Sequence, residues 1–385
     1  MPEIFGTHHS KMLILLRYDD FAQVIIHTAN MIEFDWTNMT QGVWRSPLLP
    51  KRYMPASLIS DPIGSGAKFK QDLLSYLRAY DSRRTICKPL IAALSQHDFS
   101  EIRAALVASV PTKQGVESDP DATAFGWPGL KRVLALVPVV SKDPEIVVQI
   151  SSIATLGAND KWLNKTLFKT MATSRSNTTS KPKYHIVFPT ADEIRESLNG
   201  YRSGGAVHTK IQTATQQKQL QYLRPFFRHW AGDEATASQA SATAPARREA
   251  GRKRAAPHIK TYTRFTDSTK TVIDWMLITS ANLSKQAWGD PASASGDVRI
   301  SSYEIGVLVW PELLAGTPKA KMVPTFKTDM PTFEREEDAA VDAVVGARMP
   351  YDLPLVPYAR DEDPWCATKS YDEPDWMGVV YQVHG

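Results

Sequence analysis

The residues in this sequence that are best suited to chemistry are histidines that stand two positions before a lysine. Three such His-x-Lys triplets occur, at His9/Lys11, His208/Lys210 and His258/Lys260. An imidazole can act as a nucleophile or move a proton, and a nearby ammonium can hold an anion. Because the chain has nine histidines, one triplet by itself is more simply explained as a strand end with a solvated lysine.

Two of the three triplets belong to an internal repeat. In both, a Thr or Ser followed by Ala and Asn occurs downstream, and a Trp stands six residues after that Asn. The two sets are His9, Lys11, Asn30 and Trp36, and His258, Lys260, Asn282 and Trp288. No Asn occurs in the 70 residues after His208, so the third triplet lies outside the repeat.

A β-hairpin explains why these residue types recur together. The apolar runs 10–17 and 22–29 are typical of two strands joined by a turn. A turn midway between them would place His9 directly opposite Asn30, with Lys11 on the same patch of sheet. The second repeat predicts a matching patch.

An imidazole, an ammonium and an amide are the groups that attack on a phosphodiester needs without a metal. The imidazole bonds to phosphorus, while the cationic and neutral donors hold the oxygens as charge builds. Two such patches facing each other would supply a second imidazole for the leaving group. The chain has two cysteines and no Cys/His cluster with zinc spacing. We therefore expect neither a metal nor another cofactor.

The motifs around both triplets resemble those of the tyrosyl-DNA phosphodiesterases, a branch of the phospholipase D superfamily. The first half contains FGTHHSK at 5–11, HTAN at 27–30, DW at 35–36, TQGVW at 40–44 and SP at 46–47. The second half contains HIKTY at 258–262, TSANLSK at 279–285, AWG at 287–289 and SYEIG at 302–306. The resemblance also includes SS at 151–152, LG at 156–157 and PYDLP at 350–354. It therefore covers nearly the whole chain.

The resemblance implies a reaction and a substrate. His9 would attack the phosphorus at a 3′ end of DNA and expel the tyrosine of a trapped type IB topoisomerase, while His258 donates the proton. His258 would then act as the base for the water that releases a 3′-phosphate. Four residues would bind the phosphate oxygens, namely Lys11, Lys260, Asn30 and Asn282.

The resemblance also implies roles for residues around the reacting groups. Gln41 and Glu304 would orient the two imidazoles, one through an amide and one through a carboxylate. On the DNA side, Phe5 would stack on a base. Backbone phosphates would lie near four residues, Ser151, Ser152, Ser284 and Lys285. Both repeat tryptophans are expected to pack in the core rather than to contact substrate.

The order of the expected elements indicates an α/β protein. Helices are predicted at 67–80 and 212–230, and strands at 184–188 and 272–279. By resemblance we expect two phospholipase D-like α-β-α sandwich lobes related by pseudo-twofold symmetry, at 1–115 and 116–385. Few residues precede the first motif compared with the family, so the first lobe is expected to be incomplete.

Composition and charge narrow the protein class. The chain is 43% hydrophobic and 22% charged, which is typical of a globular protein. Its 385 residues are too many for one ordinary core. No run approaches the 18 apolar residues of a membrane span. The formal charge of +4 is contributed entirely by RREAGRKR at 247–254, so overall basicity does not argue for DNA binding.

The basic run closes a stretch rich in Ala, Ser and Thr at 232–256. This composition predicts a disordered surface insertion. The run itself is either a nuclear import signal, which would place the protein in the nucleus, or a solvated loop.

Three functions stay open at this point. We favour a monomeric, metal-independent phosphodiesterase whose partner is DNA carrying a covalently attached topoisomerase peptide. A lipase or non-specific nuclease of the superfamily is disfavoured by Asn30 and Asn282, which belong to the tyrosyl-DNA branch. A catalytically impaired DNA-binding or interaction remnant would fit the short first lobe.

Overall fold

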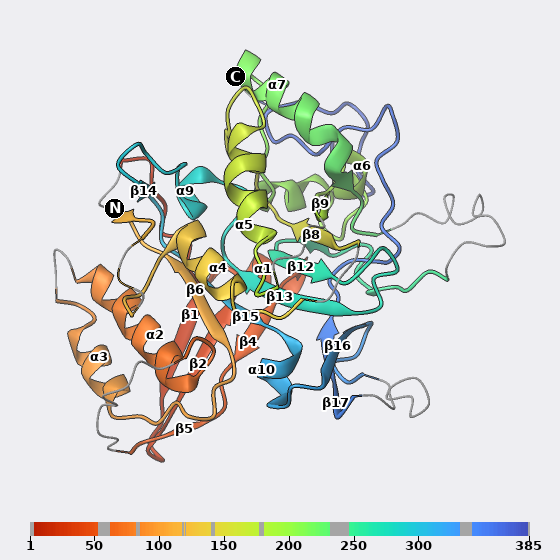
Figure 1. Ribbon diagram of the computed structural model, residues 1–385. Helices are drawn as coiled ribbons and strands as arrows, with labels where there is room; N and C mark the ends of the chain where they lie inside the picture. Colours follow the sequence, from red (N-terminus) through yellow and green to blue (C-terminus); the bar gives the residue numbers. More distant parts are fainter. Residues whose placement is uncertain are drawn as a thin grey trace.

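The computed structural model is an α/β fold in which a small and a large β-sheet share a hydrophobic core (Figure 1). It describes residues 4–52, 62–81, 85–117, 119, 121–139, 143–176, 181–231, 246–331 and 341–383. The α/β class expected from the sequence is confirmed.

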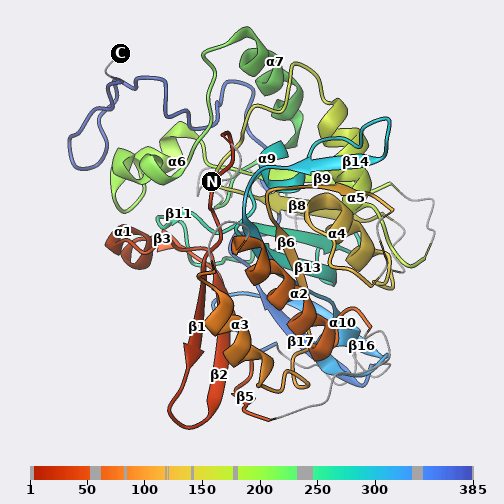
Figure 2. The ribbon, with the colours of Figure 1, turned by 90° about the vertical axis from the view of Figure 1, so that its left-hand side faces the viewer.

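The small sheet comes from the N-terminal part of the chain. Its strands are β1 (Met12–Leu16), β2 (Phe21–His27), β4 (Val43–Arg45) and β5 (Leu49–Pro50). β2 lies between β1 and β4, and alternate residues along it are buried. Two helices, α2 (Gly66–Tyr80) and α3 (Lys88–Ser95), lie beside this sheet in both ribbon views (Figures 1 and 2).

Helix α2 confirms the amphipathic helix predicted at 67–80. Ser65 begins it as the N-cap, since its Oγ accepts the backbone N–H of Lys68 at 3.2 Å. Phe69, Leu73 and Leu77 recur at helical spacing and are at most 1% exposed. They pack in one core with the buried residues of β2.

The large sheet has nine strands among the described residues. They lie in the order β10 (Phe227–Arg228), β9 (Lys183–Val187), β8 (Glu145–Gln149), β12 (Thr261–Phe265), β13 (Ile273–Thr279), β15 (Glu304–Val309) and β6 (Ala105–Ser109). β16 (Ala320–Thr325) pairs with β13, and β17 (Ala343–Arg348) pairs with β16. The predicted strands 184–188 and 272–279 correspond to β9 and β13 and are confirmed.

The remaining elements are short. The helices are α1 (Glu33–Thr37), α4 (Gly126–Leu134), α5 (Lys169–Met171), α6 (Ala191–Arg195), α7 (Ala214–Leu223), α9 (Lys285–Trp288) and α10 (Pro311–Ala315). A π-helical turn covers Leu163–Phe168, and 3₁₀ turns cover Gly200–Ala206 and Arg224–Phe226. The short strands are β3 (Met39–Thr40), β7 (Thr112–Gly115), β11 (Ala256–Pro257) and β14 (Asp297–Ile300). The helix expected at 212–230 is shorter and ends at Leu223, because Pro225 has no N–H to continue the α-helical hydrogen bonds.

Both predicted hairpins form, but their register differs from the expected one by one residue. In the first hairpin the N–H of His27 donates to the carbonyl of Lys11 at 3.1 Å. In the second, the N–H of Thr279 donates to the carbonyl of Lys260 at 3.1 Å. The expected pairing of His9 with Asn30 is therefore wrong, because the first turn is centred half a residue earlier than assumed. The second hairpin has a register shift between Arg264 and Phe265, but at the ends that carry the lysines both hairpins differ from expectation by the same one residue.

The chain enters the large sheet earlier than the lobe boundary expected at residue 115. β6 lies within the range 1–115, yet it pairs antiparallel with β15, from Ser109 opposite Glu304 to Ala105 opposite Leu308. All five residues of β6 are buried. A strand that is buried on both faces needs pairing and packing partners on each side, and the large sheet supplies them.

The end of the expected disordered insertion belongs to the folded structure. Arg247 donates from Nη2 to Oδ2 of Asp352 at 2.7 Å, and the N–H of Ala250 donates to Oδ1 of Asp352 at 2.8 Å. The backbone of Arg248 pairs with Leu353. Disorder is therefore wrong for 246–256, because composition cannot reveal bonds to a distant segment. Residues 232–245 lie outside the described residues.

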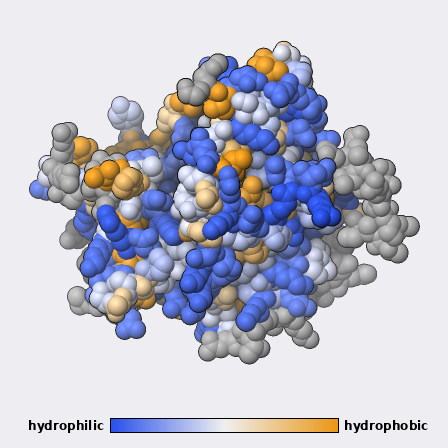
Figure 3. Space-filling model, turned by 90° about the horizontal axis from the view of Figure 1, so that it is seen from above, coloured by the Kyte–Doolittle hydropathy of each residue, from blue (hydrophilic) through white to orange (hydrophobic). Residues whose placement is uncertain are grey.

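Among the described residues, no helix is long and apolar enough to cross a bilayer. The face seen in Figure 3 is mainly hydrophilic, with small hydrophobic patches scattered over it. Scattered apolar residues of this kind are normal on a protein surface.

Asp352 allows a test of whether residues 246–256 stabilise the fold. Asp352→Ala removes the acceptor of both Arg247 and the buried N–H of Ala250. Leaving a buried donor without a partner costs about 1–3 kcal/mol, so we expect the free energy of unfolding in urea to fall by about that amount. Asp361→Ala, at an exposed position, is the control. Equal stability of Asp352→Ala and wild type would contradict the packed arrangement.

Candidate active site

A cavity of about 630 Å³ opens where the two hairpins begin and end. Both repeat histidines and both repeat asparagines line it, namely His9, Asn30, His258 and Asn282. Ser151 and Ser152, which follow β8, contribute to the same lining. The structure thus brings the two halves of the repeat into one site, as the sequence predicted.

The backbone joins each catalytic-candidate histidine to the opposite half of the chain. The N–H of His9 donates to the carbonyl of Tyr303 at 3.0 Å. The N–H of His258 donates to the carbonyl of Thr40, also at 3.0 Å. In both cases the accepting residue directly precedes the side chain that was expected to orient the imidazole. The two crossed contacts repeat the same local geometry.

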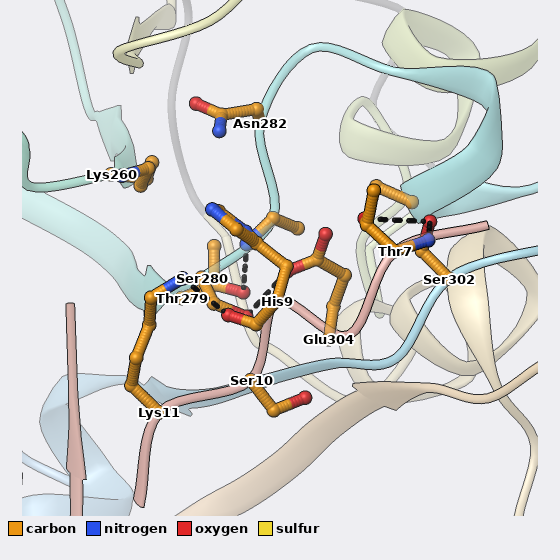
Figure 4. Close-up of polar contacts among 12 residues, drawn as sticks. Thr7, His9, Ser10, Lys11, Lys260, Thr279, Ser280, Asn282, Ser302 and Glu304 are labelled. Atoms are coloured by element: carbon orange, nitrogen blue, oxygen red, sulfur yellow. Dashed lines mark hydrogen bonds and ion pairs between the residues drawn. The ribbon is translucent and has the colours of Figure 1, made fainter. Parts of the chain in front are cut away.

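Glu304 holds the imidazole of His9. The Nδ1 atom of His9 lies 3.0 Å from Oε2 of Glu304, and Oγ of Ser280 donates to the same oxygen at 2.5 Å. Figure 4 shows His9 between Glu304 and Lys11. Glu304 is only 4% exposed. Burial opposes its charge, but His9 and the hydroxyl of Ser280 outweigh it and lower the pKa of the carboxyl. A charged Glu304 fixes the proton of His9 on Nδ1 and leaves Nε2 free.

Two side chains meet the imidazole of His258. Its Nδ1 atom is 3.3 Å from the side-chain amide of Gln41 and 3.2 Å from Oδ2 of Asp35. Burial, followed by the positive charges of Lys260 and Lys11, lowers the pKa of His258 well below its usual range. The free protein therefore holds His258 neutral at pH 7.

The two lysines are buried in equivalent positions beneath the histidines. Nζ of Lys11 donates to the carbonyl of His9 at 2.7 Å, and Nζ of Lys260 donates to the carbonyl of His258 at 2.5 Å. Burial lowers the pKa of Lys11 to about 8. Burial and the charge of Lys11 lower the pKa of Lys260. Each ammonium is thus short of negative partners, which favours binding of an anion.

The two asparagines are fixed in different ways. Oδ1 of Asn282 accepts the backbone N–H groups of Ser151 and Ser152, both at 3.0 Å. Its amide nitrogen is therefore left as a donor. Nδ2 of Asn30 instead donates to Oδ2 of Asp35 at 2.9 Å. Both side chains keep an N–H available for a phosphate oxygen.

The repeated tryptophans hold the asparagines from the backbone side. Nε1 of Trp36 donates to the carbonyl of Asn30 at 2.8 Å, and Nε1 of Trp288 donates to that of Asn282 at 3.1 Å. Trp288 is 1% exposed, as expected for a core residue. Trp36 is 55% exposed, so its expected place in the core is wrong. The indole N–H, rather than burial, is what the two copies share.

The residues expected on the DNA side are only partly gathered at the cavity. Phe5, Ser151, Ser152 and Ser284 line it, and Phe5 is 82% exposed. Ser284 also begins α9, since its Oγ accepts the N–H of Ala287 at 3.3 Å. Lys285 follows at the start of that helix and lies outside the cavity lining.

Two further residues belong to the site although the sequence reasoning did not assign them. His208, from the triplet outside the repeat, lines the cavity, and its N–H donates to the carbonyl of Ser151 at 2.8 Å. Its His-x-Lys spacing was a signal, but the missing Asn argued against it. Asp35 contacts both His258 and Asn30. Its position one residue before the repeated Trp could have indicated it.

Comparison with known proteins identifies the family. The model of the tyrosyl-DNA phosphodiesterase family matches residues 1–359. This chain belongs to the tyrosyl-DNA phosphodiesterase family. It is 31% identical over 444 residues to a probable tyrosyl-DNA phosphodiesterase of Schizosaccharomyces pombe, and 32% identical over 377 residues to tyrosyl-DNA phosphodiesterase 1 of Drosophila melanogaster.

The relatives differ in how much of their length this chain spans. It covers 78% of the S. pombe protein but 58% of the Drosophila protein, with 98% and 95% of this chain matched. A crystal structure of a yeast tyrosyl-DNA phosphodiesterase variant matches with a TM-score of 0.68 over 94% of this chain, at 22% identity. That likeness confirms the phospholipase D-like fold expected for the family.

The cavity brings together groups of several chemical types. In the described part of the chain, no group of three or more His, Cys, Asp or Glu side chains is arranged to hold a metal ion. Two imidazoles, each with Nδ1 held by a partner, line the cavity together with two amide donors. Lys11 and Lys260 lie buried outside the cavity lining and donate to the histidine carbonyls. This arrangement can transfer a phosphoryl group to an imidazole and stabilise the negative charge meanwhile.

The lowered pKa of Lys11 predicts how anion binding depends on pH. Sulfate keeps its own charge at neutral and alkaline pH, so a change in its affinity reports the protein. As pH rises through about 8, Lys11 loses its proton, and we expect the sulfate dissociation constant to rise. Lys11→Arg, which stays charged, should flatten this rise, whereas Lys113→Arg at an exposed site should not. Titration calorimetry that finds one affinity on both sides of pH 8 would contradict the assignment.

Proposed function

We propose that this chain is a DNA repair phosphodiesterase that hydrolyses 3′-phosphotyrosyl and related 3′-end adducts of DNA through a covalent phosphohistidine. The observation that carries the proposal is the pair of imidazoles in one cavity, each held through Nδ1 by a side chain of the opposite half. With Nδ1 engaged, Nε2 of each ring is the atom left for chemistry. Such a pair supplies one nucleophile and one proton carrier.

In the first step Nε2 of His9 attacks the 3′ phosphorus. A bond forms between nitrogen and phosphorus while the bond from phosphorus to the tyrosyl oxygen breaks. His258 gives its proton to that oxygen, so tyrosine leaves as a neutral phenol. A well-placed general acid contributes about 10²- to 10⁴-fold in rate. Because His258 is neutral in the free protein, it takes up this proton when the phosphate anion enters the cationic cavity.

In the second step water breaks the phosphohistidine. Neutral His258, left after the first step, accepts a proton from water as its oxygen bonds to phosphorus. The bond between phosphorus and Nε2 of His9 breaks, and a 3′-phosphate end is released. The two buried ammonium groups and the two amides bind the equatorial oxygens in both steps. His258 then gives the accepted proton to solvent as the 3′-phosphate leaves, which returns the site to its starting state without a metal or an external reductant or oxidant.

The DNA strand carrying a topoisomerase peptide is the partner we propose. Phe5 is exposed at the cavity and offers a ring on which a base can stack. Ser152 offers a hydroxyl to a backbone phosphate, and Ser284 would exchange its hydrogen bond to Oε1 of Gln286 for one to a phosphate. Action as a monomer and localisation in the nucleus stay part of the proposal.

Chelation tests the absence of metal from the chemistry. We expect the release of tyrosine from a 3′-phosphotyrosyl oligonucleotide to continue in EDTA at the rate seen without it, because Lys11 and Lys260 supply the positive charge that a metal would otherwise supply. Loss of turnover in EDTA and its return on adding magnesium would refute the proposed chemistry.

Replacing His258 tests the order of the two steps. His258→Gln removes the base of the second step, so the phosphohistidine on His9 should outlive the first step and appear as a covalent DNA–protein band on a denaturing gel. His9→Ala should give no band, since it removes the nucleophile. Bands of equal intensity from both variants would show that the two histidines do not have the proposed roles.

A further inference from the structure

Asp35 is a buried carboxylate at the centre of contacts that neither repeat predicts. It is 0% exposed, although it lies on the five-residue helix α1. Its Oδ2 atom accepts the N–H of Asn30 at 2.6 Å and the side-chain amide of Asn30 at 2.9 Å, and lies 3.2 Å from Nδ1 of His258. Its Oδ1 atom is buried with no hydrogen-bond partner among the described residues.

Packing of α1 does not account for this burial. Glu33, Trp36 and Thr37 of the same helix are exposed and Phe34 is half-buried, so α1 lies on the surface and Asp35 is its one fully buried residue. Burying a carboxylate costs on the order of several kcal/mol of folding free energy, which well-placed partners must offset. An apolar residue would fill the same space at no such cost. A buried, partly unpaired carboxylate beside titrating groups is typical of a functional site.

The second repeat shows what Asp35 adds. Five residues after Asn282 the chain has Ala287, where the first repeat has Asp35. The side chain of Asn282 is held by backbone N–H groups, which place no negative charge in the site. Asp35 therefore fixes its asparagine with a charge, and the same oxygen reaches the histidine of the other half. The extra negative charge of the first repeat thus lies beside His258, the imidazole that is proposed to carry the proton.

Gln41 cannot supply what Asp35 supplies to His258. The amide of Gln41 is engaged elsewhere, since its Oε1 accepts Oγ of Thr28 at 2.8 Å and its Nε2 donates to the carbonyl of Asp35 at 3.2 Å. It is also neutral, so it orients an imidazole without favouring the protonated ring.

The other ionisable groups around His258 are basic. Lys260 precedes β12, and Lys11 and His9 come from the first hairpin. His208 follows the 3₁₀ turn at 200–206. All four lower the pKa of His258 and so disfavour its protonated form. Among the described residues, Asp35 is the one carboxylate within hydrogen-bonding distance of its Nδ1.

We propose that Asp35 is a positioning residue that holds His258 and Asn30 together and supports proton donation by His258 to the leaving group. Nδ1–H of His258 points at Asp35, so the proton that is transferred sits on Nε2. When that proton moves to the tyrosyl oxygen, the ring becomes neutral and keeps its bond to Asp35. The inference rests on the proposed function and adds a residue to it.

The test compares two leaving groups in single-turnover formation of the adduct on His9. Tyrosine needs a proton to leave, whereas 4-nitrophenol leaves readily without one. We expect Asp35→Asn to slow adduct formation at least tenfold with a 3′-phosphotyrosyl oligonucleotide and less than threefold with a 3′-(4-nitrophenyl) phosphate oligonucleotide. Asp35→Glu, which keeps the carboxylate, should recover part of the tyrosyl rate. Glu33→Gln removes one charge from an exposed site of the same helix and should leave both rates unchanged.

Equal slowing with both leaving groups would show that Asp35 is merely structural, and no slowing would show that it has no role. A second measurement does not need activity. Titration of His258 by NMR should move to lower pH in Asp35→Asn and stay unchanged in Glu33→Gln, and an unchanged titration in Asp35→Asn would overturn the proposal. If wild type released neither leaving group, the proposed function would fail, while the NMR result would still decide whether Asp35 supports the charge of His258.

Discussion

Each imidazole in the cavity is held by a residue from the opposite half of the chain, and the rest of the site depends on this crossing. His9 begins the first hairpin and is oriented by Glu304, while His258 begins the second and lies beside Gln41. Backbone bonds set up both contacts, from His9 to Tyr303 and from His258 to the residue before Gln41. Neither half can complete its own catalytic group alone. The repeat therefore works only when the two halves are packed together.

The close approach of the two halves is visible in the backbone around Gln41. β3 pairs in parallel with β11, directly before His258. A side chain at Gly42 would place its Cβ atom 2.5 Å from Cδ1 of Ile278 and 2.6 Å from Cδ1 of Ile259, so both isoleucine side chains would have to shift. Glycine thus lets the segment carrying Gln41 lie against the second hairpin, and this brings the amide to the imidazole.

Crowding of positive groups gives the site its chemistry. Burial lowers the pKa of His258 and of Lys260. The positive charges of Lys260 and Lys11 lower the pKa of His258 further, and the charge of Lys11 does the same to Lys260. In the proposed reaction, a bound phosphodiester adds negative charge beside the imidazoles, and this favours the protonated form of His258 when its proton is needed. Two carboxylates of the lining act against these cations. Glu304 places a negative charge at Nδ1 of His9, and Asp35 places one at Nδ1 of His258.

The sequence predicts most of the residues that form the site but not their detailed contacts. The spacing of two His-x-Lys triplets with their asparagines was enough to predict one shared cavity. It could not fix the register, since a turn displaced by half a residue fits the same apolar pattern, and the real pairing places Lys11 opposite His27. The sequence does not reveal that Asp35 and His208 belong to the site, because their contacts join segments far apart in the chain. The exposure of Trp36 and the folding of 246–256 likewise depend on tertiary neighbours that composition does not reveal.

The most direct test of the crossed arrangement is which nitrogen of His9 bonds to phosphorus. The adduct trapped with His258→Gln, prepared with ¹⁵N-labelled histidine, can be examined by ³¹P–¹⁵N correlation NMR after digestion. Because Glu304 occupies Nδ1 of His9 at 3.0 Å, the account predicts phosphorus on Nε2 of His9. Phosphorus on Nδ1, or on any other residue, would contradict it.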